Sequence, residues 1–460
     1  MQKLVAKYGL AAHLALLAVA PLVLFPYLDG KAMATVMLWL SAFAGVWLLL
    51  EPSVRSGEHL RRARMRVLHG IARDPLFWAS VAVVAFAGLR ALNAGVGLGY
   101  DAELSVWKMQ PPDFPILPGS VGDAGFLPFA VSVAGMVLMQ GCRHSMGRAS
   151  RMAFWLLSSA LTGLGAAVAI VAAHFGCEGA GAMMAVSDSA FTFLGLACGF
   201  HLLSGTVALE TAFENRWNAA MLLLPLSVGG TGAGLFCFSP TFVTLAFAGA
   251  ELVVLAYSFF YACRRLPSAG EFKLLVVCGV SFALGGLLVM MLTPAPLMQE
   301  RLAAFAERTF FAERFWKLRE VLSAIAFKSW VSHLWTGTGL ASFSLDFRFN
   351  ARPEDWMLLP RGIASLPSGW WLILAERGVV GAVMFVLPFG FLLFTYGRRL
   401  ALWISDMSVP HPACVVAPVA LALFVASGFV DCSLTRADVI LVMVSLLAVS
   451  AAAFPRRKKC

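Results

Sequence analysis

The sequence predicts an all-α, polytopic integral membrane protein with about twelve transmembrane helices and one large external loop between spans nine and ten. Apolar residues make up 60% of the 460 residues and charged residues only 13%, about half the fraction in soluble domains. The mean hydropathy is +0.81. The apolar runs are long and lack the two-residue alternation of membrane strands, so we expect each run to form a helix.

The boundaries of the spans follow from the length of each apolar run, since about 20 helical residues cross a hydrocarbon core of ~30 Å. The first run resembles a secretory signal peptide in length, but no small-residue cleavage pattern follows it and a second run starts at Lys31. This favours a first span. The expected spans lie near residues 8–27, 32–50, 77–93, 125–141, 152–173, 189–209, 218–236, 241–262, 272–293, 379–396, 412–430 and 439–454. The chain thus divides into a bundle of nine spans (1–293), an external loop (294–378), and three further spans with a basic tail (379–460).

Positive charge falls on alternate connections between the runs, and this predicts the orientation of the chain. The net charge is +10. Arg and Lys gather in residues 51–76, 142–151, 264–273, 398–399 and 456–459. Because cytoplasmic loops retain positive charge, we expect both termini in the cytoplasm. The distribution of basic residues is therefore explained mainly by membrane topology, with contact to anionic lipid as a second role. It predicts no nucleic-acid partner.

The sequence motifs predict neither a metal nor a cofactor. The chain contains no CxxC pair and no Walker, Rossmann or HExxH motif. Of its nine cysteines, Cys177, Cys237 and Cys432 are expected outside the membrane. A disulfide among these three stays open, since sequence does not fix a pairing.

Ionisable side chains within the expected spans are functional candidates, because charge is costly there. Glu251 is the deepest, and it is either a proton or cation site or a neutral carboxyl that fixes helix packing. Arg90 lies near the outer end of span three, and we expect its side chain to reach the interface. His201 has small neighbours, which favours a neutral, packed imidazole.

The external loop opens with an amphipathic helix. Its apolar stripe recurs at steps of three and four residues, so the stripe occupies one helical face. The stripe consists of Phe311, Phe315, Leu318, Leu322 and Ile325. We expect this helix to lie along the outer membrane–water boundary, with Trp316 and Trp330 as interfacial anchors.

Between residues 300 and 361 the loop carries nine basic and seven acidic side chains. The basic ones are Arg301, Arg308, Arg314, Lys317, Arg319, Lys328, Arg348, Arg352 and Arg361. Two interpretations stay open: a solvated face, or a surface that binds a phosphorylated lipid head through planar guanidinium groups.

The end of the loop combines a glycine-rich turn with a return to the membrane. The stretch WTGTGLASF, Trp335–Phe343, is expected to form a tight turn, because Gly337 and Gly339 permit one. In the following LPSGWWLILAERGVVG, the charged pair Glu376–Arg377 interrupts an apolar run. This predicts a short re-entrant helix that turns into span ten.

This order of features resembles the O-antigen ligase and O-antigen polymerase superfamily. The segment ERFWKLREVLSAIAFKSWVSHLWTGTGLASF is similar to that family's loop helix and Gly-Thr-Gly turn, and LAERGVVG is similar to its entry into the next span. The match covers about residues 313–381. Around it, the span layout with a large, late external loop also agrees.

The resemblance implies glycosyl transfer at the external face of a bacterial inner membrane. A polyprenyl-pyrophosphate-linked glycan would be the donor, and a hydroxyl on a lipid or glycan the acceptor, without metal or cofactor. Cations would stabilise the departing pyrophosphate, and a base would activate the hydroxyl. By position, Arg314 matches the family's loop Arg and is expected to contact the pyrophosphate in catalysis. Glu376 matches the Glu of the family's re-entrant motif, and a catalytic and a structural role stay open for it. The cations expected to bind substrate are Arg308, Lys317, Arg319, Arg348, Arg361 and Arg377.

Two positions depart from the family pattern. The family usually has a His about nine residues before its Glu, where this chain has Pro367. The family's Ser-Arg before span eight reads Ser239–Pro240. The general base is therefore unassigned, and Asp346, Glu354 or Asp355 would serve only if the loop folds over the site.

Two other functions stay open on the sequence. The chain could be a non-catalytic partner in polysaccharide assembly or export. It could also be a lipid-glycan or solute transporter, with Glu251 as its coupling group.

Overall fold

The computed structural model describes most of the chain, with gaps. It covers residues 2–24, 30–56, 60–101, 106–110, 114, 119–174, 218–238, 241–265, 268–306, 313–350, 352, 368–405, 413–429 and 432–453. The expected span at 189–209, His201, Arg308, Arg361, Pro367, Glu354 and Asp355 lie outside the described residues.

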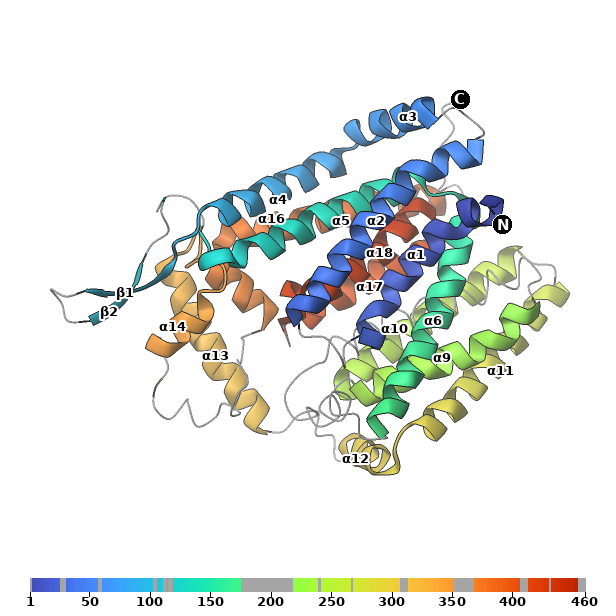
Figure 1. The fold of residues 1–460 in the computed structure, drawn as a ribbon. Helices are drawn as coiled ribbons and strands as arrows, with labels where there is room; N and C mark the ends of the chain where they lie inside the picture. Colours follow the sequence, from blue (N-terminus) through green and yellow to red (C-terminus); the bar gives the residue numbers. More distant parts are fainter. Residues whose placement is uncertain are drawn as a thin grey trace.

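The described residues are almost entirely helical (Figure 1). The helices of the first half are α1 (Gln2–Leu24), α2 (Gly30–Ser56), α3 (Leu60–Ala72), α4 (Pro75–Leu92), α5 (Phe126–Ser145) and α6 (Arg148–His174). Those of the second half are α9 (Asn218–Phe238), α10 (Thr241–Arg265), α11 (Ser268–Leu292), α12 (Ala295–Ala306), α13 (Glu313–Ser332), α14 (Phe343–Asn350), α16 (Gly369–Ser405), α17 (Ala413–Ser427) and α18 (Ala437–Ala453). Two short 3-10 helices, η1 (Gly122–Gly125) and η3 (Cys432–Thr435), precede α5 and α18.

Several of these helices have the length and composition of membrane spans. Among the described residues, four segments are long and apolar enough to cross a bilayer: Pro75–Leu92, Gly122–Ser145, Ser150–Val168 and Gly369–Arg398. Shorter apolar stretches occur in α1, α2, α10, α11, α17 and α18. The helical class is thus confirmed and membrane insertion is indicated, while the number of twelve spans stays a prediction.

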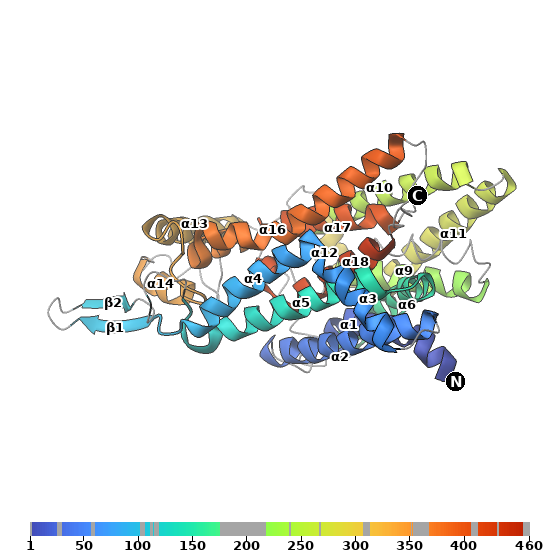
Figure 2. The ribbon, with the colours of Figure 1, turned by 90° about the horizontal axis from the view of Figure 1, so that it is seen from above.

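A β-hairpin is the main departure from the all-α prediction. Strands β1 (Gly97–Asp101) and β2 (Val106–Gln110) pair antiparallel, with Tyr100 opposite Trp107. The hairpin projects from one end of the bundle (Figures 1 and 2), whereas α3 lies beyond the other end of α4 (Figure 1). The sequence does not reveal this hairpin, because strands of five residues are too short to give a clear alternation.

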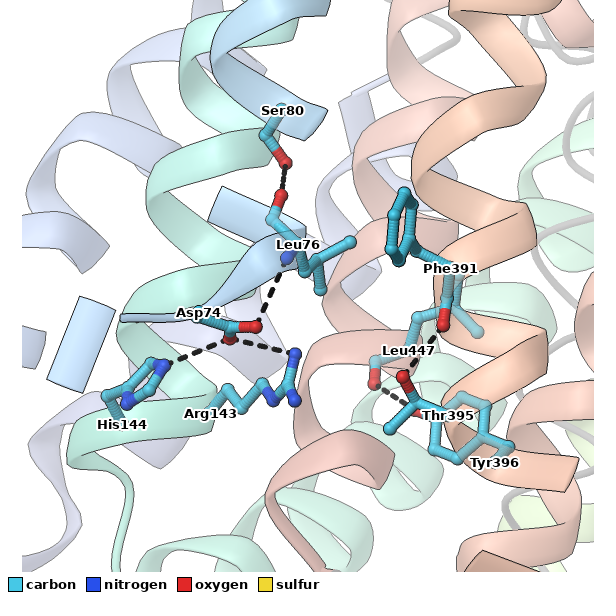
Figure 3. Close-up of polar contacts among 9 residues, drawn as sticks. All are labelled: Asp74, Leu76, Ser80, Arg143, His144, Phe391, Thr395, Tyr396 and Leu447. Carbon is cyan, nitrogen blue, oxygen red and sulfur yellow. Dashed lines mark hydrogen bonds and ion pairs between the residues drawn. The ribbon is translucent and has the colours of Figure 1, made fainter. Parts of the chain in front are cut away.

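The core of the bundle surrounds α18. Its residues Leu441, Leu446 and Leu447 are at most 1% exposed, and α18 lies among α1, α2, α5 and α17 (Figure 1). The Tyr396 hydroxyl of α16 donates to the Leu447 carbonyl at 3.1 Å (Figure 3). This bond joins α16 to α18 at the centre of the bundle.

Helix α4 is fixed at its start by Asp74, which is its N-cap. One carboxylate oxygen accepts from Leu76 N at 3.1 Å, while the other lies 2.8 Å from Arg143 Nη1 and 3.1 Å from His144 Nε2 (Figure 3). Burial acts to raise the pKa of Asp74, but the His144 hydrogen bond, the Arg143 charge and the Leu76 N–H outweigh it and lower the pKa below 3.8. The ionised carboxylate therefore joins α4 to the end of α5.

Candidate functional site

The glycine-rich turn packs directly against the interruption in α16. Thr338 N donates to the Ala375 carbonyl at 2.9 Å, and Gly339 N to the Glu376 carbonyl at 3.1 Å. In return, Val379 N donates to the Leu334 carbonyl at 2.9 Å. These bonds run in both directions, so the turn and the helix interruption form one rigid unit.

Two glycines make this contact possible. Gly378 has φ 64° and ψ −171°, a non-helical conformation inside α16, and Gly337 has φ 69°. A Cβ on Gly378 would lie 2.3 Å from the Trp335 carbonyl oxygen, and one on Gly337 would lie 2.4 Å from the Glu376 carbonyl carbon. The two backbones approach too closely for any side chain. The helix interruption at Gly378 directly follows the charged pair that the sequence marked.

Glu376 is buried at the centre of this unit. Its carboxylate accepts from Phe343 N, the first residue of α14, at 3.4 Å. Because helix N-termini attract negative charge, this contact fixes α14 against α16. Its backbone carbonyl accepts from Arg90 and Gly339. The described geometry therefore gives Glu376 a supporting position, and its catalytic role stays a prediction.

Arg90 of α4 also lies under the turn, which corrects the expectation that it reaches the interface. The side chain is 1% exposed. Its Nη2 donates to the Glu376 carbonyl at 2.5 Å and to the Thr336 carbonyl at 3.2 Å. The guanidinium also stands 5.4 Å from the centre of the Phe86 ring. Hydrogen bonds to these backbone carbonyls offset the cost of removing the guanidinium from water, so the side chain does not have to reach the membrane–water interface.

Arg90 and Arg377 both line a partly open cavity of about 160 Å³ between α4, α5, α16 and α18. Arg90 Nε and Nη1 and Arg377 Nε are buried, and no hydrogen-bond acceptor for them exists among the described residues. Most of the cavity wall is apolar, with Val83, Phe385 and Ile440 among its lining residues. The site thus combines a partly open, mostly apolar cavity with two guanidinium groups whose buried N–H groups can donate to a ligand.

The described part of the apolar stripe faces protein, which corrects its expected place on the membrane surface; Phe311 and the side chains of Phe315 and Leu318 lie outside the described residues. Leu322 and Ile325 are buried with Phe343 of α14 and Leu372 of α16 in one cluster. The α13 face that remains uncovered carries Phe327, Val331 and the neighbouring Trp335. Packing of Leu322 and Ile325 against α14 and α16 removes their apolar surface from water.

The remaining predicted site residues are placed only in part. Arg314 and Lys317 lie on α13 and Arg348 on α14, but their side chains fall outside the described residues. Arg319 is half-buried on α13. Of the predicted residues, the structure thus brings together Glu376 and Arg377, with Arg90 as a member that the sequence did not suggest. The only local sign of this role was a charge within an apolar helix. The carbonyls that accept hydrogen bonds from Arg90 belong to Thr336 and Glu376, which are 246 and 286 residues away in the sequence.

Among the acidic candidates, Asp346 is buried beside the turn. Burial raises the pKa of Asp346 above its usual 3.8, although hydrogen bonds with Thr338 and Ser329 and the charge of His333 oppose this rise. His333 itself is exposed, and its Nδ1 lies 3.0 Å from Ser332 Oγ. A carboxyl that binds a proton more readily than usual beside the turn is suited to proton transfer.

Glu251 and Cys237, the other candidates, lie away from this site. Glu251 is 4% exposed in α10. The Cys237 thiol lies 3.8 Å from the Thr293 hydroxyl, whereas the side chains of Cys177 and Cys432 are outside the described residues. In the described part of the chain, no three His, Cys, Asp or Glu side chains are grouped to hold a metal ion.

Comparison with known proteins adds no assignment: no family model matches the sequence, and no curated protein matches it.

Proposed function

We propose that this chain is a glycan-assembly membrane protein that transfers a polyprenyl-pyrophosphate-linked oligosaccharide to an acceptor hydroxyl on the external face of a bacterial inner membrane. The observation that carries the proposal is the cavity whose apolar walls meet Arg90 and Arg377 below a rigid turn. An apolar chamber with cations at one end suits a lipid with a phosphate head. The resemblance of residues 313–381 to O-antigen ligases and polymerases supports the same donor.

The chemistry requires one bond exchange. The bond between the sugar C1 and the pyrophosphate oxygen breaks, and a bond between C1 and the acceptor oxygen forms. The acceptor proton passes to a base, and polyprenyl pyrophosphate leaves with the bonding electron pair. Negative charge grows on the leaving oxygen, so nearby guanidinium N–H groups lower the barrier.

The residues divide into contacting and positioning roles. Arg377 and Arg90 offer N–H groups to the pyrophosphate, and Arg314 on α13 adds a third cation. Glu376 holds α14 and the turn through Phe343 N. Among the described acidic candidates, Asp346, with its raised pKa beside the turn, is the carboxyl assigned to receive the proton.

The topology that fits this function has about twelve spans and both termini in the cytoplasm. The turn then lies at the external surface, where a lipid-linked glycan is presented. The basic helix α3 lies at the opposite, cytoplasmic end of the bundle, in keeping with the positive-inside rule.

The test uses cells that lack the gene and express variants at equal levels, with surface glycans analysed on gels. Arg377→Ala should lower glycan transfer on the order of 100-fold, as removal of a single transition-state donor does, and Arg377→Lys should restore part of it. Lys328→Ala, which removes an exposed cation from α13, is the matched control and should behave as wild type. Normal glycan in an Arg377→Ala strain whose protein melts like wild type would refute the assignment.

One observation keeps a transporter as the second candidate: Glu251 is buried within an apolar helix. A carboxyl in such a place often couples transport to protons. Under our proposal, Glu251→Gln leaves glycan transfer unchanged. Loss of lipid-glycan movement across vesicles in Glu251→Gln, with no transferase activity in the wild type, would favour the transporter.

A further inference from the structure

Helix α3 is a basic helix with no acidic residue, and it precedes the start of α4, whereas the turn packs against the other end of α4 at Arg90 (Figure 1). Arg61, Arg62 and Arg64 are exposed on it. Two large apolar side chains, Met65 and Leu68, are also about half exposed, at 49% and 50%. A short helix that exposes cations and large apolar groups together is typical of a membrane surface rather than of bulk water.

Beside α3, a second cavity of about 900 Å³ lies between α2 and α5. Its walls are almost entirely apolar; Leu38 and Val46 come from α2, Leu68 and Ile71 from α3, and Phe129 and Val137 from α5. Several of these side chains are exposed, including Val46 at 56%. The cavity is therefore a groove on the side of the bundle, with α3 lining one end.

The length of the groove matches one leaflet of a bilayer. On α2 it is lined from Leu38 to Leu48, and ten helical residues rise about 15 Å. One leaflet occupies half of a hydrocarbon core of ~30 Å. A lipid chain in this groove would end at α3, where the arginines of that helix begin.

We propose that α3 and this groove form a binding site for an anionic phospholipid of the adjacent leaflet. The acyl chain lies between α2 and α5, and the phosphate head meets Arg61, Arg62 and Arg64. Guanidinium groups bind phosphate through paired N–H groups, and several basic residues without an acidic neighbour on the helix favour an anionic head over a zwitterionic one. The same charges disfavour a second apolar helix as the occupant, because its end would have to pass a cluster of cations.

The test is lipid binding by the full-length protein in detergent, followed by native mass spectrometry with phosphatidylglycerol and phosphatidylcholine as probes. Wild type should bind phosphatidylglycerol more tightly. The triple variant Arg61→Gln, Arg62→Gln, Arg64→Gln should lose on the order of 100-fold in that affinity, since each basic residue contributes about a factor of five. Binding of phosphatidylcholine should change little.

A second variant tests the groove. Ala42 is exposed and lines it, so Ala42→Trp should fill the groove and exclude the chain of either lipid. Val253→Trp, at an exposed position of α10, is the control and should bind lipid as wild type does. Equal affinity of wild type for both lipids, or unchanged binding in the arginine variant, would overturn the proposal. A dimer that Ala42→Trp dissociates without affecting lipid binding would instead assign the groove to a second copy.

Discussion

Replacing Gly378 with Ala should separate the turn from α16. The residue sits at φ 64° and ψ −171°, a conformation that costs a side-chain-bearing residue about 1–3 kcal/mol. The added Cβ would meet three backbone atoms: Trp335 O at 2.3 Å, Trp335 C at 2.4 Å and Gly337 N at 2.6 Å. Relief of this overlap requires the turn to move away, which breaks hydrogen bonds such as those from Val380 N and Gly339 N. At about 1 kcal/mol for each bond, the total destabilisation is about 3–5 kcal/mol.

The assay is unfolding of the purified protein in detergent, compared with Gly390→Ala. Gly390 lies in the same helix, and no atom comes within 4 Å of a Cβ built there. That control should be as stable as wild type or more so, because Ala favours a helix over Gly by about 1 kcal/mol. If Gly378→Ala and Gly390→Ala unfold alike, the turn is not locked to α16 and the description of the site is wrong.

Two further predictions concern buried carboxylates. Asp74→Asn should destabilise the protein by about 1–3 kcal/mol at neutral pH, because it removes the charge that pairs with Arg143; wild type and variant are compared by chemical unfolding. The pKa of Asp74 is lower in the folded protein than its unfolded value of 3.8, so this advantage is complete above pH 3.8 and is lost as pH falls through the folded pKa; an advantage that persists at lower pH would contradict it. Asp346 behaves oppositely: its folded pKa is raised above 3.8, so wild type should lose stability relative to Asp346→Asn as pH rises from 3.8 through the folded pKa. A pH-independent difference in melting temperature would show that Asp346 does not titrate in this way.

The apolar helices and the turn could be predicted from the sequence because their signals are local. Residues 218–236, 241–262 and 272–293 were expected as spans, and α9, α10 and α11 occupy these positions. The turn at Gly337 and Gly339 was expected from glycine spacing, and both residues have positive φ. Such features depend on neighbours within one or two helical turns.

The site itself depends on contacts between distant segments, and these could not be predicted. Arg90 carries no local sign that its acceptors are the carbonyls of Thr336 and Glu376. The stripe containing Leu322 was assigned to the membrane surface, because periodicity marks an apolar face without indicating whether lipid or protein covers it. Burial by α14 and α16 became visible only in the folded chain.

The most direct test of the proposed function is transfer by the purified protein in nanodiscs. A polyprenyl-pyrophosphate-linked oligosaccharide and a glycan acceptor are supplied, and released polyprenyl pyrophosphate and product are measured together. We predict one polyprenyl pyrophosphate for each bond formed, no effect of a metal chelator, and a rate on the order of 100-fold lower in Arg377→Ala. Donor binding without any product from the wild-type protein would contradict transfer, and failure of the donor to bind would contradict the cavity as its site.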